Sequence, residues 1–381
     1  MTYAGAASGA PAADDKATKV DLGGNTICPG FIDVHVHFSL PGTKGIPAMA
    51  VLTSPEYRAM QLLERFKITL EAGVTTARDL MGVAPGVRDA IDHGLIPGPR
   101  LHVSSKMLSQ TCGHADFHLK SGIDGGDVIG GELVDTVDQA RTAARELIRD
   151  GVNGIKVASS GGVSTPNDDP DFLGARPEII EALVQEGQDY GGIPVAAHAI
   201  GYPGIKAAVE AGVHSVEHGY ALDDDLRKQM IENGQYLVPT LIETLKDDTA
   251  TPMAVAKSQK WHKIAQDSVA ESVKAGVKIA TGTDAGLVPD HGDNLGELGC
   301  LVKFGGMSPL DAITAATKHG AEVLKIEDQV GTVEPGKLAD IVVVKGNPLD
   351  DIDGLKDHDN ILLVVKEGKS AIDRGDFGYP A

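Results

Sequence analysis

The segment FIDVHVHF, residues 31–38, places two histidines one residue apart in an otherwise apolar run. In a β-strand the side chains at positions i and i+2 lie on the same face. His35 and His37 therefore point to one side of the predicted strand, whereas Val36 points to the other. A single histidine there would be interpreted as a hydrogen-bonded core residue. Two converging imidazoles are also consistent with a metal site, because neutral imidazole is the commonest metal ligand in proteins.

From residue 31 onward, short apolar runs alternate with amphipathic segments, which is typical of β-α units on a parallel sheet. Several helical segments carry capping signals, such as Ser54-Pro55 before one helix and Gly73, Gly151 and Gly276 after others. The expected strands are 31–37, 75–79, 100–104, 154–157, 195–198, 215–218, 237–239 and 278–284. This number of strands over roughly 260 residues matches a (β/α)8 TIM barrel. We therefore expect an α/β fold with a metal-binding barrel over residues 31–325.

The two ends of the chain have a different pattern. After a helical run come GTVEPGKLADIVVV and NILLVVKEG, which are two β-rich segments separated by turn residues. Together with residues 1–30, residues 326–381 would form a small β-sandwich domain built from both chain ends, with a C-terminal tail.

Composition excludes several classes of protein. The formal net charge of −20 argues against nucleic acid or an anionic membrane as a partner, because such a surface repels both. The three cysteines, Cys28, Cys112 and Cys300, form no CxxC pair, so neither a disulfide framework nor a thiolate zinc site is expected. There is no signal-peptide pattern and no run of the ~18 apolar residues that span a bilayer, which favours a cytoplasmic setting.

Residues that can bind metals follow several of the predicted strands. In a barrel of this type, catalytic groups lie at the C-terminal ends of strands. Each residue also has a structural interpretation: Lys156 could form a buried ion pair, Asp284 could cap a turn, and His214 lies at the opposite end of its strand. The structural interpretation is less convincing for the whole set, which consists of His35, His37, Lys156, His198, His218 and Asp284.

Lys156 has a chemical logic among these groups. A protonated lysine repels a metal ion, but a desolvated lysine beside cations loses its proton more readily. The free amine can add carbon dioxide to give a carbamate, whose two oxygens are able to bridge two divalent ions.

The ordered motifs of residues 18–368 resemble those of a known family. They are FIDVHVHF, GVTTARDL, GIKVASSGG, AAHAIG, SVEHGY, TGTDAG and GTVEPGKLADIVVV. Together they are similar to the amidohydrolase superfamily, in its branch of metal-dependent prolidases, ochratoxinase and imidazolonepropionase-like proteins. Phenylurea and molinate hydrolases look similar at the metal centre. The resemblance also implies N-terminal sandwich strands ahead of residue 1, so the small domain is expected to lack its first strands.

The resemblance implies two divalent metal ions. His35, His37 and Asp284 would bind the first, His198 and His218 the second, and a carboxylated Lys156 would bridge both. A hydroxide shared by the metals would be the nucleophile, and Asp284 would pass its proton to the leaving amine. Zinc is the expected metal, with cobalt or manganese as alternatives.

Substrate contacts are less well defined by the resemblance. SQTCGHADFH looks like a loop that the prolidase branch usually writes TGGHGD, which points to His114 as a group that binds the substrate or polarises its carbonyl. Cys112 and Ala115 depart from that pattern. Tyr220 is placed either to donate a hydrogen bond from its hydroxyl to the oxyanion that forms from the substrate carbonyl, or to serve only as a packing residue. His118 and His291 are expected to face solvent, in the loops SQTCGHADFH and GLVPDHGD.

The predicted function is hydrolysis of a C–N bond in a small-molecule substrate, an amide of an N-acyl amino acid or dipeptide. Aryl-urea or (thio)carbamate hydrolysis is the alternative, and the lack of a basic cluster in the rim loops mildly favours neutral substrates. A metal-dependent deaminase is disfavoured by Lys156, and a non-catalytic scaffold by the complete ligand set. We expect a homo-oligomer.

Overall fold

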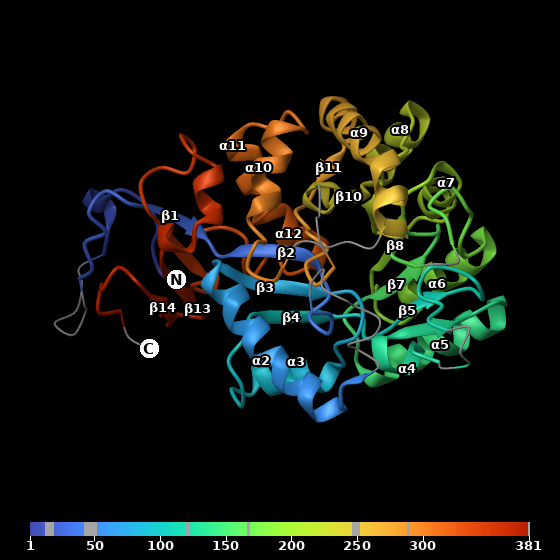
Figure 1. The fold of residues 1–381 in the computed structure, drawn as a ribbon. Coiled ribbons are helices and arrows are strands. Elements are labelled where there is room, and N and C mark those ends of the chain that lie inside the picture. The colour runs from blue at the N-terminus through green and yellow to red at the C-terminus, as the bar shows by residue number, and fades with distance from the viewer. Residues whose placement is uncertain are drawn as a thin grey trace.

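The computed structural model describes residues 1–11, 19–41, 52–118, 122, 124–165, 168–245, 252–287 and 290–379. Parallel strands and the helices between them form the body of the molecule, and an antiparallel sheet lies at one side, near both termini (Figure 1). In the part of the chain described, no helix is long and apolar enough to cross a membrane.

Two parallel sheets form the centre of the molecule. A seven-stranded sheet has the order β11-β10-β9-β8-β7-β5-β6, and a three-stranded sheet has the order β2-β3-β4. β2 also bonds to the chain that follows β11, because Val34 N donates to Thr281 O at 2.9 Å and His37 N to Ala285 O at 2.8 Å. The strands are β2 (Phe31–Val36), β3 (Val74–Asp79), β4 (Arg100–Val103), β5 (Met107–Ser109), β6 (Gly131–Leu133), β7 (Ile155–Ala158), β8 (Val195–Ala199), β9 (Ser215–His218), β10 (Tyr236–Val238) and β11 (Lys278–Ile279).

Each strand predicted from the sequence has a counterpart, but the last one is much shorter than expected. Only Lys278–Ile279 forms a regular strand of the predicted 278–284, and the rest continues as irregular chain beside β2. β5 and β6 were not predicted, because three residues are too few to show the alternation that marks a strand. The α/β class with parallel sheets is confirmed, and closure into a complete barrel stays a prediction.

The helices begin and end where the capping signals predicted. The Ser54 side chain accepts a hydrogen bond from Tyr57 N at 3.3 Å, and Gly151 ends a helix with φ of 92°. The α-helices are α2 (Pro55–Glu71), α3 (Pro85–Asp92), α4 (Gly126–Ile129), α5 (Val137–Asp150), α6 (Pro177–Asp189), α7 (Tyr202–Glu210), α8 (Asp224–Asn233), α9 (Pro252–Ala275), α10 (Gly296–Lys303), α11 (Pro309–Ala315) and α12 (Lys318–Leu324). The 3-10 helices are η1 (Ala7–Gly9), η2 (Leu241–Thr244), η3 (Asp353–Lys356) and η4 (His358–Asn360).

A four-stranded antiparallel sheet combines both ends of the chain. Its order is β1-β12-β13-β14, from β1 (Thr26–Pro29), β12 (Ile341–Val344), β13 (Ile361–Lys366) and β14 (Lys369–Asp373). Arg100 of β4 joins it to the parallel strands, with its guanidinium 2.5 Å from Asp340 Oδ2 and 2.6 Å from Glu367 Oε1. The predicted second sheet of a sandwich and the domain boundaries at residues 30 and 325 stay predictions.

The Arg100 contact generates a test of how the antiparallel sheet is held. Asp340 is buried, so Arg100→Ala leaves its carboxylate without a compensating charge. We expect a loss of about 2–4 kcal/mol in the free energy of unfolding, measured by urea denaturation. Arg149→Ala is the matched control, because Arg149 is 68% exposed beside Asp150 and its removal should change stability by less than about 0.5 kcal/mol. Equal losses in the two variants would contradict this role.

Candidate metal centre

Two histidines meet the carboxylate of Asp284: His35 in β2 and His37 directly after it. His35 Nε2 lies 3.4 Å from Asp284 Oδ1, and His37 Nε2 lies 3.0 Å from the same oxygen. All three side chains are buried. Strand alternation therefore turns both imidazoles to one side, as the sequence predicted, and the chain after β11 brings the carboxylate to them.

The backbone around Asp284 is fixed by β2. Asp284 N donates to His35 O at 2.8 Å, and the residue takes the left-handed conformation with φ of 62°. Asp33 Oδ2, buried beneath, accepts from Thr283 Oγ1 at 2.6 Å and Asn294 Nδ2 at 2.7 Å. Burial would raise the pKa of the Asp284 carboxyl, but the neighbouring His35 and His37 hold it well below its usual range. Asp284 therefore offers an ionised oxygen to a cation.

His198 and His218 face each other from neighbouring strands. His198 Nδ1 lies 2.9 Å from His218 Nε2, at the C-terminal ends of β8 and β9. The other nitrogens have protein partners: His198 Nε2 lies 3.1 Å from Gly161 O, and His218 Nδ1 lies 2.8 Å from Thr240 Oγ1. Burial lowers the pKa of His198 well below its usual value. The two imidazoles thus direct one nitrogen each toward the same point.

Lys156 of β7 is fully buried, and its Nζ has no hydrogen-bond partner among the described residues. Burial lowers the pKa of this amine to about 8. A buried ammonium without a hydrogen-bond partner is costly, so this amine loses its proton more readily than an exposed lysine and is easier to modify. This unpaired nitrogen fits the carbamate that the sequence suggested.

The arrangement fits divalent metal ions. Among the described residues, ligand atoms of His35, His218 and Asp284 all lie within 4.8 Å of one another. Imidazole nitrogen and carboxylate oxygen are ligands for zinc and similar ions. The predicted set is thus partly gathered around one point, and the possible His/Asp site lies in the interior of the fold.

A buried ion pair that the sequence patterns did not predict lies next to His35. Glu217 Oε2 lies 2.8 Å from His35 Nδ1, and Glu217 Oε1 lies 2.8 Å from the Arg78 guanidinium. Burial would raise the pKa of Glu217, but Arg78 and His35 hold it well below the usual range. A carboxylate on the far nitrogen of a ligand histidine fixes the ring and its tautomer. The sequence signal was the glutamate inside the predicted strand 215–218, where an unpaired charge would be costly if the strand is buried.

The two predicted substrate residues occupy different settings. The His114 ring stacks on His198, with centroids 4.1 Å apart and planes 18° apart. Tyr220 lies beside His218, but its hydroxyl is 3.0 Å from Thr240 Oγ1 and 3.2 Å from Thr240 O. His114 is therefore next to a predicted ligand, whereas Tyr220 would have to give up a protein contact to reach a substrate.

The two rim histidines differ from each other. His118 is 56% exposed, as expected. The prediction for His291 was wrong, because its ring is largely buried, stacks on Phe38 at 5.2 Å and holds Leu40 O at 3.1 Å. The imidazole packs on Phe38, in the chain after β2, and the composition of the loop could not indicate this contact.

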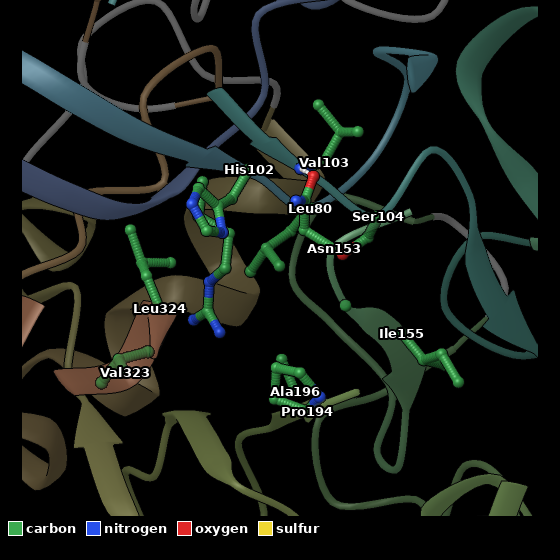
Figure 2. A pocket seen from close by; sticks show the side chains of 12 residues that line it. Leu80, His102, Val103, Ser104, Asn153, Ile155, Pro194, Ala196, Val323 and Leu324 are labelled. Carbon is green, nitrogen blue, oxygen red and sulfur yellow. Dashed lines mark hydrogen bonds between the residues drawn. The ribbon is translucent and has the colours of Figure 1, made fainter. Parts of the chain in front are cut away.

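A small pocket is lined by residues in or next to β3, β4 and α12 and by residues at the starts of β7 and β8 (Figure 2). It has about 10 Å³ of space, enough for one water molecule. Its lining is Arg78, Leu80, His102, Val103, Ser104, Asn153, Gly154, Ile155, Pro194, Ala196, Val323 and Leu324. Because Gly154 and Pro194 precede β7 and β8, this pocket is separate from the strand ends that carry the histidines.

The buried Lys156 makes stability depend on pH in a defined way. Its amine has an ordinary pKa of 10.5 in the unfolded chain and about 8 in the folded protein. Between pH 8 and pH 10.5 the unfolded chain binds more protons at this lysine than the folded protein does, so the free energy of unfolding rises with pH in this range. Below about pH 8 the lysine is charged in both states, and the full cost of burying the ammonium lowers the free energy of unfolding.

We therefore expect Lys156→Met to stabilise metal-free protein in CO2-depleted buffer by on the order of 2–3 kcal/mol at pH 7. The gain over the wild type should shrink toward pH 10, as measured by urea denaturation at both pH values. Lys228→Met, at a position 75% exposed, is the control and should show no such dependence. A destabilised Lys156→Met protein at pH 7 would contradict the burial cost.

Comparison with known proteins agrees with this architecture. The model of the amidohydrolase family matches residues 26–371. Ochratoxinase from Aspergillus niger is 32% identical over 373 residues, which covers 90% of this chain and 75% of that protein. The structure of a Xaa-Pro dipeptidase with bound methionine is 34% identical with a TM-score of 0.85, and the match covers 95% of this chain and 90% of that one.

A more distant structure has a similar fold. Molinate hydrolase is 21% identical with a TM-score of 0.76, over 99% of this chain and 88% of that one. The family match spans the β2 histidines, Lys156, the histidines of β8 and β9, and Asp284. This chain therefore belongs to the amidohydrolase family, whose members related to it are hydrolases of carbon–nitrogen bonds.

Proposed function

We propose that this protein is a dinuclear metal-dependent amidohydrolase that cleaves the amide bond of an N-acyl amino acid or a dipeptide. The observation that carries the proposal is the buried Lys156 amine, which has no hydrogen-bond partner among the described residues and lies close enough to His35, His198 and Asp284 to interact with them electrostatically. A metal-free structural role would leave this buried nitrogen without a hydrogen bond.

The residues divide into two sets of ligands. His35, His37 and Asp284 would hold one ion, because both imidazoles already approach the same carboxylate oxygen. His198 and His218 would hold the other through the nitrogens that now face each other at 2.9 Å. The Lys156 carbamate would supply one oxygen to each ion, and zinc, cobalt or manganese suits this nitrogen and oxygen set.

The chemistry is hydrolytic. Bound divalent ions would supply Lewis-acid polarisation of the scissile carbonyl and lower the pKa of water toward neutrality. Asp284 would accept the proton of the attacking water and transfer it to the amine nitrogen as the C–N bond breaks. His114, stacked on His198, would contact the carbonyl end of the substrate, and Tyr220 would close the same side of the site.

Metal content tests the ligand assignment. We expect about two divalent ions per chain by elemental analysis, and Lys156→Ala should lower both the metal content and kcat/KM, the latter by at least roughly a hundredfold. A short carboxylate such as propionate should partly restore activity, because it supplies two oxygens in place of the carbamate.

The matched control is Lys278→Ala. Lys278 is the first residue of β11, and its side chain is 52% exposed. It should keep the wild-type metal content and activity. One ion per chain with full activity in Lys156→Ala would rule out the bridging carbamate.

Substrate class is tested by direct competition. The likeness to a Xaa-Pro dipeptidase and to ochratoxinase supports amides as substrates. A panel of N-acyl amino acids and X-proline dipeptides should be turned over with kcat/KM at least about tenfold above that for phenylureas and thiocarbamates, which is a difference of about 1.4 kcal/mol in transition-state binding. Turnover of the ureas or thiocarbamates alone would replace the amide assignment by the alternative one.

A further inference from the structure

The chain after β7 packs against the His114 ring. Gly162 has no room for a side chain there, because a Cβ would lie 2.3 Å from His114 Cε1. The ring also stacks on His198. The imidazole is therefore in contact with both a backbone and a predicted metal ligand, which restricts its tilt but not its tautomer.

Asp168 contacts one ring nitrogen of His114, the Nδ1 atom. Its Oδ2 lies 3.2 Å from His114 Nδ1 and accepts from Gly162 N at 2.7 Å. Thr165 Oγ1 lies 2.8 Å from the same Nδ1. The Asp168 side chain is only 3% exposed. An ionised carboxylate at this distance favours a proton on Nδ1 and leaves Nε2 available for a second partner.

Lys257 of α9 binds the backbone around His114 at Gly162, Thr165 and Asp168. Its Nζ donates to Thr165 O at 2.6 Å, to Gly162 O at 3.3 Å and to Asp168 O, and it lies 3.2 Å from Asp168 Oδ1. The Lys257 side chain is 14% exposed, so the ammonium is largely used by these oxygens. It both neutralises the carboxylate and fixes the backbone that carries it.

We propose that Asp168 is a positioning residue that sets the tautomer and orientation of His114, and that Lys257 holds Asp168 in place for this purpose. The inference rests on the proposed function, because His114 is the group that would contact the substrate carbonyl. Burial would raise the pKa of Asp168, but the hydrogen bond with His114 leaves it below its usual value, which agrees with an ionised carboxylate.

The first test is a double-mutant cycle on the best amide substrate. Asp168→Asn keeps the size of the side chain, but its amide can donate to Nδ1 and so favours the opposite tautomer. We expect kcat/KM to fall roughly ten- to a hundredfold in Asp168→Asn, with the same division between kcat and KM as in His114→Ala. In the His114→Ala background, Asp168→Asn should cause no further loss. Losses that multiply would show that Asp168 acts independently of His114.

Lys257→Met and Lys260→Met are a matched pair of variants that tests whether Lys257 holds Asp168 in place. Both lysines lie on α9 and pair with the same loop region, but Lys260 is about half exposed and pairs with Asp171, away from His114. Lys257→Met should lower kcat/KM in the same direction as Asp168→Asn, and Lys260→Met should leave it unchanged. Equal effects of the two substitutions would overturn the role of Lys257.

A readout without substrate separates this inference from the proposed function. In protein labelled with ¹⁵N-histidine, the His114 signals are identified by their loss in His114→Ala. We expect Nδ1 to carry the proton in the wild type and Nε2 to carry it in Asp168→Asn. An unchanged tautomer overturns the inference even if amides are hydrolysed, whereas failure of all amides with the expected change of tautomer overturns only the substrate assignment.

Discussion

The approach of Asp284 Oδ1 to the Nε2 atoms of His35 and His37 is the interaction on which the site depends. It connects β2, at the start of the parallel strands, with the irregular chain after β11, and the backbone of Asp284 bonds to His35 O across the same junction. Burying a carboxylate there is costly unless cationic or hydrogen-bonding groups compensate it. The histidines supply that compensation, and the same geometry offers donor atoms to a metal.

Around this junction a second set of buried polar groups holds the ligands in orientation. Glu217, which is paired with Arg78, contacts the far nitrogen of His35, and Thr240, the residue before η2, contacts His218. Glu297 of α10 in turn accepts from the first two N–H groups of η2, at 2.8 and 2.7 Å, and burial raises the pKa of Glu297 to about 8. Rigid support of this kind is what a catalytic site needs to keep its groups in productive geometry.

Much of this could be predicted from short-range patterns. The alternation of FIDVHVHF places His35 and His37 on one face, and the parallel-strand pattern brings His198 and His218 to adjacent strand ends. The short strands β5 and β6 were not predicted because three residues are too few to show a period of two. The irregular form of residues 280–284 was not predicted because it depends on hydrogen bonds to segments far away in the sequence, such as β2. His291 was misjudged because its ring is buried against Phe38.

The sequence by itself determined the alternation of the longer strands and helices and the placement of residues of metal-binding type at the ends of several strands, because these follow from periods of two and 3.6 residues and from capping chemistry. Only the tertiary structure decided which polar groups stand behind them. Glu217 reaches Arg78 across 139 positions, and Lys257 reaches the Asp168 loop across 89. Such pairings depend on how strands and helices pack. A buried charge needs a compensating group, and the fold decides which group lies within hydrogen-bonding distance.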